Sequence, residues 1–183
     1  MAASLAACSQ SGSGSSSQAA GESSSSAVEE SSIAGEESSA AEASETPETV
    51  TITSLNAEGA ETQLEVPYDP QRIAILDMAS LDILDALGVG NRVVGTASTS
   101  LDYLQSYINE DIANLGTIKE ADLEAVMSCE PDVIFIGGRL AGSYDALSEI
   151  APVVYLSTDT EQGVVESVRK NANTIASLFG LEE

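Results

Sequence analysis

Two glycines followed by an arginine form the segment of this sequence best suited to contact a ligand. Gly137, Gly138 and Arg139 follow the apolar run PDVIFI, which is typical of a buried strand. Glycines let the backbone turn sharply and approach a ligand closely. A guanidinium is always charged, donates forked hydrogen bonds to oxyanions and stacks on aromatic rings. A helix is expected to begin near Arg139, and its free N–H groups would favour an anion. The simpler alternatives are that Arg139 pairs with Asp145 or points to solvent.

Two further loops are expected beside this one. Asp77 and Met78 follow the apolar run RIAIL, and Thr96 ends the run RVVGT and opens a loop to Ser100. In an open α/β sheet, ligands bind outside the carboxyl ends of the strands. We therefore predict that Asp77, Met78 and Thr96 line the same site as the glycines and the arginine.

The usual signatures of catalysis do not occur in this sequence. The chain has no histidine, which removes the commonest general base and metal ligand. It also has no GxGxxG, Walker A or GxSxG motif. Its carboxylates are spread singly along the expected helices, which is typical of solvated faces. The prediction is a protein that is not an enzyme and has no metal site or cofactor of its own.

Strands and helices alternate in the secondary structure that the sequence predicts from residue 50 onward. A β-hairpin is expected at 49–55 and 62–67, because β-branched and polar residues alternate there. Apolar strands are expected at 72–76, 92–96, 131–138 and 151–156, and helices at 79–90, 101–108, 121–128, 144–150 and 163–180. This order favours an α/β fold: a Rossmann-like three-layer sandwich around a parallel sheet of about four strands.

The N-terminal quarter of the chain has a different composition. Residues 9–49 hold fifteen Ser and eight Glu, with no aromatic or basic residue. Such a stretch cannot bury enough apolar surface to fold, so a disordered linker is predicted. Of the chain's net charge of −24, residues 50–183 carry 22 acids and all six bases. Nucleic acid is therefore a poor partner, and an anionic ligand would need a local positive site.

The two cysteines differ in their surroundings. Cys8 ends the segment LAAC, which has the pattern of a bacterial lipobox, so residues 1–8 are interpreted as a truncated lipoprotein signal with Cys8 as the site of lipid attachment. Only seven residues precede Cys8 and none is charged, so an accidental match, in a cytosolic protein with a low-complexity leader, is the alternative. Cys129 is expected to be a small buried hydrophobe.

Three segments carry a resemblance to a known family: PQRIAILDMASLDILDALGVGNRVVGT, NLGTIKEADLEAVMSCEPDVIFIGGR and DALSEIAPVVYL. They resemble the N-terminal lobe of the periplasmic-binding-protein family that serves iron–siderophore, haem and cobalamin importers. Within that family they are most similar to the binding proteins of Gram-positive bacteria for catecholate siderophores of the petrobactin type. The resemblance covers residues 50–183, the whole part expected to fold.

The resemblance implies a function that spacing alone does not. Such proteins hold the ligand between two lobes joined by a long helix, and this chain ends where that helix is expected, with one lobe. Arg139 matches the arginine that this lobe contributes to ferric catecholate binding. Glu124 matches the acidic residue that docks on the permease, although a solvent-facing role is the alternative. The loop from Thr96 to Ser100 lacks the basic residue that relatives often carry there.

The resulting hypothesis is the substrate-binding component of an ABC importer. It would be a monomer, lipid-anchored on the extracytoplasmic face of a Gram-positive-like cell membrane, and would deliver a ferric siderophore, with catecholates favoured, to the permease and ATPase subunits. Cobalamin, haem or a hydroxamate siderophore are alternative ligands. A fragment of a cofactor-dependent α/β enzyme and a purely adhesive lipoprotein are alternative functions.

Overall fold

A computed structural model describes residues 47–161 and 163–182 of the chain. The segment 1–8 with Cys8, and most of the linker 9–49, lie outside the described residues. The strands are β1 (Thr49–Leu55), β2 (Glu61–Pro67), β3 (Ile73–Ile75), β4 (Val93–Thr96), β5 (Ala113–Asn114), β6 (Gly116–Thr117), β7 (Glu120–Ala121), β8 (Val133–Ile136) and β9 (Val153–Tyr155). The helices are α1 (Met78–Ala86), α2 (Leu123–Ser128), α3 (Tyr144–Ser148) and α4 (Val164–Ser177), with 3₁₀ helices η1 (Gly90–Arg92), η2 (Asp102–Tyr107) and η3 (Gly138–Ser143).

Five parallel strands form the central sheet, in the spatial order β5-β4-β3-β8-β9. The four strands predicted from apolar runs are all present. The prediction missed β5, because its two residues, Ala113 and Asn114, form no apolar run. β1 and β2 form the predicted antiparallel hairpin, in which Thr49 lies opposite Pro67.

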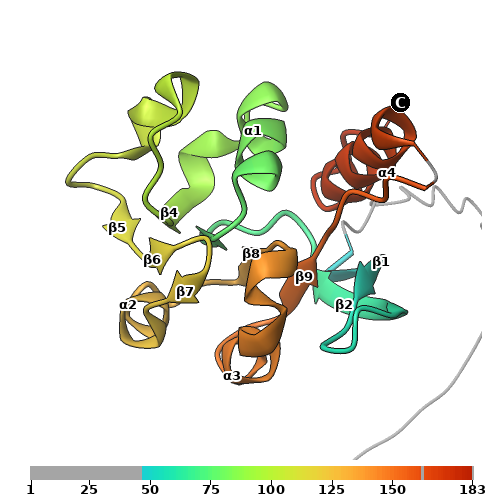
Figure 1. The fold of residues 1–183 in the computed structure, drawn as a ribbon, viewed down its shortest axis with the longest axis horizontal. Helices are drawn as coiled ribbons and strands as arrows, with labels where there is room; N and C mark the ends of the chain where they lie inside the picture. The colour runs from blue at the N-terminus through green and yellow to red at the C-terminus, as the bar shows by residue number, and fades with distance from the viewer. Residues whose placement is uncertain (1–46, 162, 183) are drawn as a thin grey trace, which may run out of the picture. The chain divides into compact units, whose positions relative to one another are not determined.

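Alternate residues of the central strands enter two different apolar layers, as the period of a strand requires. Ile73 and Ile75 pack in a cluster with residues of α1, α4 and the β1–β2 hairpin. Ala74 and Leu76 pack in a second cluster with residues of α2, η3 and α3. Figure 1 shows α1 and α4 on one side of the sheet and α2 and α3 on the other. The predicted three-layer α/β sandwich is confirmed.

Two expectations about helices need correction, those at 101–108 and near Arg139. The segments at 102–107 and 138–143 form 3₁₀ helices rather than α-helices, as is usual for pieces of one or two turns. In α4, Ile175 is buried, and so is Phe179 just after the helix, but Val164 and Val168 are 54% and 44% exposed. The apolar stripe of α4 therefore enters the core only in its second half.

Cys129 is buried at the end of α2, as expected for a small hydrophobe. Burial raises the pKa of its thiol, and the nearby charge of Arg72 opposes this shift only in part. The thiol therefore stays protonated and is a poor nucleophile at neutral pH. Among the described helices, none is long and apolar enough to cross a membrane.

Candidate functional site

The candidate site lies where the order of the strands reverses. From β3 the chain proceeds through β4 to β5 on one side and then returns to β8 and β9 on the other side. The carboxyl ends of β3 and β8 are therefore neighbours at a topological switch point, which is the usual place for a ligand crevice in an open α/β sheet. Two of the three predicted loops begin here, at Asp77 and at Gly137.

Asp77 joins these two loops. One oxygen of its carboxylate, Oδ2, accepts hydrogen bonds from the backbone N–H of Ser80 at 2.9 Å and from the Ser80 hydroxyl at 2.8 Å. Asp77 is thus the N-cap of α1. Its other oxygen, Oδ1, would lie only 2.6 Å from a Cβ atom placed on Gly137. The close approach of the two loops therefore favours glycine at position 137, because a larger residue would push the Asp77 carboxylate away.

Gly138 and Arg139 lie at the surface beyond this contact. A Cβ atom on Gly138 would meet only the hydroxyl of Tyr155, at an ordinary 3.4 Å, so position 138 is not restricted to glycine by packing. Arg139 is exposed and forms no ion pair within residues 47–161 and 163–182. The alternative in which Asp145 neutralises it is not realised in the structure. The guanidinium of Arg139 is therefore exposed on the loop that follows β8, and its role in ligand binding stays a prediction.

The helix expected to add its N-terminal dipole to the positive charge of Arg139 is shorter and of a different type than predicted. Gly138–Ser143 is a 3₁₀ helix of six residues, and its first residue is not capped by a side chain. So short a helix aligns few peptide dipoles, and its field at Arg139 is correspondingly small. The positive character of this loop therefore rests on the side chain of Arg139 and not on a helix terminus.

Two predicted site residues are largely covered by the protein itself. Met78 is partly buried and packs against both apolar clusters, because it starts α1 directly above the sheet. Thr96 is only 2% exposed, and its hydroxyl donates to the carbonyl of Ala97. Thr96 is therefore almost wholly covered, and it lines a smaller hollow of about 270 Å³ with Tyr107 and Ala113, so its place in the ligand site stays a prediction.

Glu124 lies far from this loop in the sequence, on the exposed face of α2. It is in the first turn of the helix, after the N-cap Asp122, whose carboxylate accepts from the N–H of Ala125 at 3.0 Å. Leu123 and Met127 beside it are 38% and 58% exposed. This surface is open to a partner, and the docking role of Glu124 stays a prediction.

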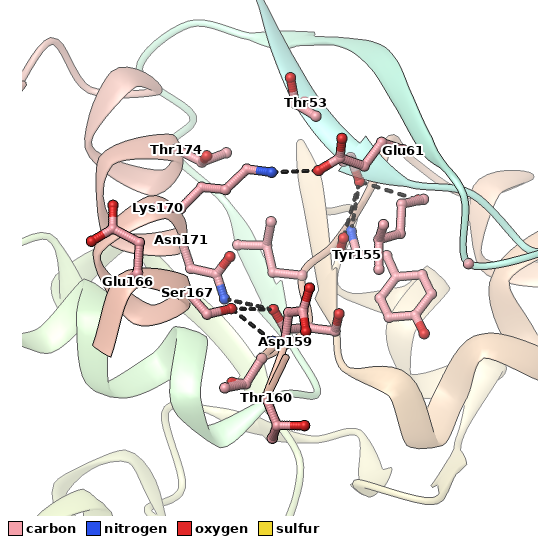
Figure 2. A pocket seen from close by; sticks show the side chains of 16 residues that line it. Thr53, Glu61, Tyr155, Asp159, Thr160, Glu166, Ser167, Lys170, Asn171 and Thr174 are labelled. Carbon is pink, nitrogen blue, oxygen red and sulfur yellow. Dashed lines mark hydrogen bonds and ion pairs between the residues drawn. The ribbon is translucent and has the colours of Figure 1, made fainter. Parts of the chain in front are cut away.

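A sizeable hollow lies elsewhere in the described part of the chain, at the carboxyl end of β9 (Figure 2). It has a volume of about 610 Å³ and lies between the β1–β2 hairpin, the segment after β9, and α4. Sequence reasoning missed it, because nothing in the sequence shows that the hairpin packs near α4. It contains none of the predicted ligand-binding residues.

The polar groups of this hollow bind one another. Figure 2 shows the ammonium group of Lys170 directed at the carboxylate of Glu61, with which it forms an ion pair. The hydroxyl of Ser167 accepts from the backbone N–H of Asp159 at 2.7 Å, and the amide of Asn171 donates to the carbonyl of Ser157 at 3.1 Å. A ligand would have to displace these bonds, so we place the candidate site at the switch point instead.

The chemical character of the switch point comes from Arg139. Within the described ranges, no group of three or more Asp, Glu, Cys or His side chains is placed to hold a metal ion. An exposed arginine at the carboxyl edge of the sheet can bind an oxyanion through charge and forked hydrogen bonds. An oxygen-rich anionic ligand therefore fits this site better than a neutral one.

Comparison with known proteins identifies relatives of this arrangement. Residues 73–183 match the family described as periplasmic binding protein. The petrobactin-binding protein YclQ of Bacillus subtilis is 37% identical over 120 residues, which are 65% of this chain and 38% of YclQ. The ferric-anguibactin-binding protein FatB of Vibrio anguillarum is 35% identical over 99 residues, 53% of this chain and 30% of FatB.

Solved structures agree with the sequence comparison. The crystal structure of YclQ superposes with a TM-score of 0.67 at 34% identity, covering 74% of this chain and 47% of YclQ. The catecholate-siderophore binding protein VctP of Vibrio cholerae superposes with a TM-score of 0.64 at 29% identity, covering 73% and 47% of the two chains. The chain thus spans less than half the length of these relatives. All three are binding proteins, in agreement with the prediction of a function that is not enzymatic.

Proposed function

Because the chain belongs to the periplasmic binding protein family, we propose that it captures a ferric siderophore for delivery to an ABC permease. The observation that carries the proposal is the exposed Arg139 at the switch point of the sheet, which has no ion-pair partner among the described residues. Residues 50–183 hold 22 acids and six bases, so an exposed cation at the carboxyl edge of the sheet gives this part of the domain a local positive charge. It would attract the anionic, oxygen-rich surface of a ferric chelate.

A catecholate is the ligand that we favour. The guanidinium can pair with the negative charge of a ferric catecholate and stack on its rings. YclQ binds petrobactin and VctP binds catecholate siderophores, so two of the relatives support this choice by their own ligands. FatB binds ferric anguibactin, which keeps other siderophore classes among the outcomes of the test.

The remaining parts of the proposal concern the partners of the chain. Iron would arrive already chelated, so the protein would need no metal ligands on this lobe. Glu124, exposed on α2 between two apolar side chains, would dock on the permease. Cys8 would carry the lipid, and the Ser- and Glu-rich segment 9–49 would act as a spacer between the outer face of the membrane and the lobe.

An NMR titration of the ¹⁵N-labelled chain tests the proposed function. Gallium(III) replaces iron because it is diamagnetic, and the ligands are its complexes with a hexadentate tricatecholate, a trihydroxamate and protoporphyrin, together with cobalamin. We expect the tricatecholate complex to shift the amide signals of Gly137, Gly138 and Arg139. Substitution Arg139→Ala should weaken its binding about tenfold, the value of a hydrogen bond to a charged group.

The control removes an equal charge elsewhere. Arg169 pairs with Glu166 on α4 at 2.9 Å and both side chains are 64% exposed, so Arg169→Ala should leave the affinity unchanged. If no gallium chelate shifts the three loop amides at millimolar concentration, the proposed function is wrong. If a chelate binds with equal affinity to Arg139→Ala, Arg139 is not part of the site.

A further inference from the structure

The six basic residues of the chain fall into two groups. Four are held by other parts of the protein: Arg72 donates to the carbonyls of Cys129 and Glu130, Arg92 pairs with Asp69, Arg169 with Glu166 and Lys170 with Glu61. The other two, Arg139 and Lys119, have no ion-pair partner among the residues that the structure describes. Arg139 already belongs to the candidate site, so Lys119 is the cation that has no assigned role.

Lys119 is fixed at the tip of the β6–β7 hairpin. The hydroxyl of Thr117 accepts hydrogen bonds from the backbone N–H groups of Lys119, at 3.2 Å, and of Glu120, at 3.1 Å. Ile118 packs against the apolar cluster on the α2 side of the sheet and anchors the turn. The backbone of Lys119 is thus held in place while its side chain is exposed.

The hairpin lies at the same edge of the sheet as the switch point. It follows β5, which is parallel to the other strands, so it begins at their carboxyl edge. Ser98, in the loop after β4, donates to the carbonyl of Gly116 through its N–H at 2.9 Å and its hydroxyl at 3.0 Å. On its other side, β7 packs against η3, the element that carries Arg139. The two unpaired cations therefore lie on neighbouring elements.

We propose that Lys119 is a second cationic contact for the ligand of this lobe, beside Arg139. The inference rests on the proposed function and narrows its ligand to a chelate with net negative charge. No hydrogen bond or ion pair within the described residues engages the ammonium group of Lys119, although residues 50–183 contain 22 acids and only six bases. The two cations differ in kind: the guanidinium forms directed, forked bonds, whereas the ammonium is a compact charge on a flexible stem.

This difference predicts how the two residues contribute. Arg139 would supply orientation, and Lys119 would supply attraction that depends on the charge of the ligand and on ionic strength. The loop from Thr96 to Ser100 contains no base of its own, so the hairpin is the neighbouring element that adds positive charge on the β4 side of Arg139.

The test compares two probes of different charge on the 183-residue chain. The gallium(III) complex of a hexadentate tricatecholate is trianionic, and the gallium(III) complex of a linear trihydroxamate lacks that charge. Substitution Lys119→Ala should weaken binding of the first about threefold, as for an exposed ion pair, and leave the second unchanged. Lys119→Arg should keep the wild-type affinity. Arg169→Ala is the control for net charge, because it removes the same charge from a pair on α4.

The outcomes separate the inference from the function on which it rests. If the wild-type chain and Arg169→Ala bind the trianionic probe equally and Lys119→Ala binds it just as well, the inference is wrong while the proposed function stands. If Lys119→Ala loses the same affinity for both gallium complexes, the inference is also wrong, because a contact based on charge would weaken binding of the trianionic complex only. If neither probe binds the wild-type chain, both the proposed function and the inference fail.

Discussion

The contact between Asp77 and Gly137 predicts that the two loops of the candidate site are energetically coupled. A methyl group on Gly137 would lie 2.6 Å from the Oδ1 atom of Asp77, well inside the ~3.5 Å of ordinary contact. The carboxylate would have to withdraw by about 1 Å. Because its Oδ2 atom is bonded to Ser80 at 2.9 and 2.8 Å, this movement would break the N-cap of α1.

The magnitude follows from two opposing effects. Loss of an N-cap costs about 1 kcal/mol. Glycine-to-alanine substitution restricts the unfolded chain and stabilises a protein by about 0.4–1 kcal/mol where the backbone permits it. Gly137 has φ −108° and ψ 176°, which alanine adopts without strain. Gly137→Ala should therefore be neutral to destabilising by about 0.6 kcal/mol in the wild type. In the Asp77→Ala background, where cap and clash are both absent, it should be stabilising.

A double-mutant cycle measures this coupling. The free energies of unfolding of the wild type, both single variants and the double variant are obtained from urea denaturation followed by far-UV circular dichroism. We expect a coupling energy of about 1 kcal/mol. Gly142, whose added Cβ atom would meet nothing within 4 Å, provides the control: Gly142→Ala should have the same effect in both backgrounds. Additivity within about 0.3 kcal/mol for Gly137 and Asp77 would refute the contact.

Two further predictions concern side chains that support the fold. Burial, and next the hydrogen bond that Tyr107 donates to Asp85 at 2.6 Å, raise the pKa of Tyr107 above its ordinary value, so the unfolded chain releases this proton first. Stability should therefore fall as the pH rises above about 10, by up to about 1.4 kcal/mol per unit, and urea denaturation should show a smaller fall in Tyr107→Phe. Arg92 pairs with Asp69 and lies 5.2 Å from the ring centre of Phe179. Substitution Arg92→Ala should therefore lower the free energy of unfolding by about 1–2 kcal/mol in the same assay. The exposed pair of Arg169 and Glu166 is the comparison, and Arg169→Ala should lower it by less than about 0.5 kcal/mol.

The sequence predicted the elements whose side chains form continuous or alternating apolar patterns. The run PDVIFI contains β8, and the four residues of this strand, Val133–Ile136, are all buried. The segment TVTITSL forms β1, which pairs with β2 as expected. The same reasoning missed β5, because two residues carry no period. Their place in the sheet depends on the pairing of Ala113 with Gly95, which only the folded chain provides.

The candidate site was predictable only where it depends on chain order. Strands followed by glycine or by a capping aspartate place Asp77, Gly137 and Arg139 at one edge, and the structure brings these loops together. The burial of Thr96 could not be foreseen, because its cover comes from neighbouring segments of the fold. The sequence also could not predict that Lys119 lacks an ion-pair partner among the described residues, because a lysine in a turn has the same sequence pattern whether or not a carboxylate neutralises it.

The division of the basic residues explains how so acidic a lobe can offer a positive site. Arg92 pairs with Asp69, and Lys170 pairs with Glu61, which is far away in the sequence. The charges of these two residues are therefore neutralised within the fold. Arg139 and Lys119 join nothing within the described residues, and their charges remain available to a ligand. Binding and stability should therefore separate: substitution of either free cation should weaken capture of an anionic chelate while leaving the free energy of unfolding within about 0.5 kcal/mol of the wild type. A loss of stability in Arg139→Ala as large as that in Arg92→Ala would show that Arg139 belongs to the fold, and the positive site would lose its main component.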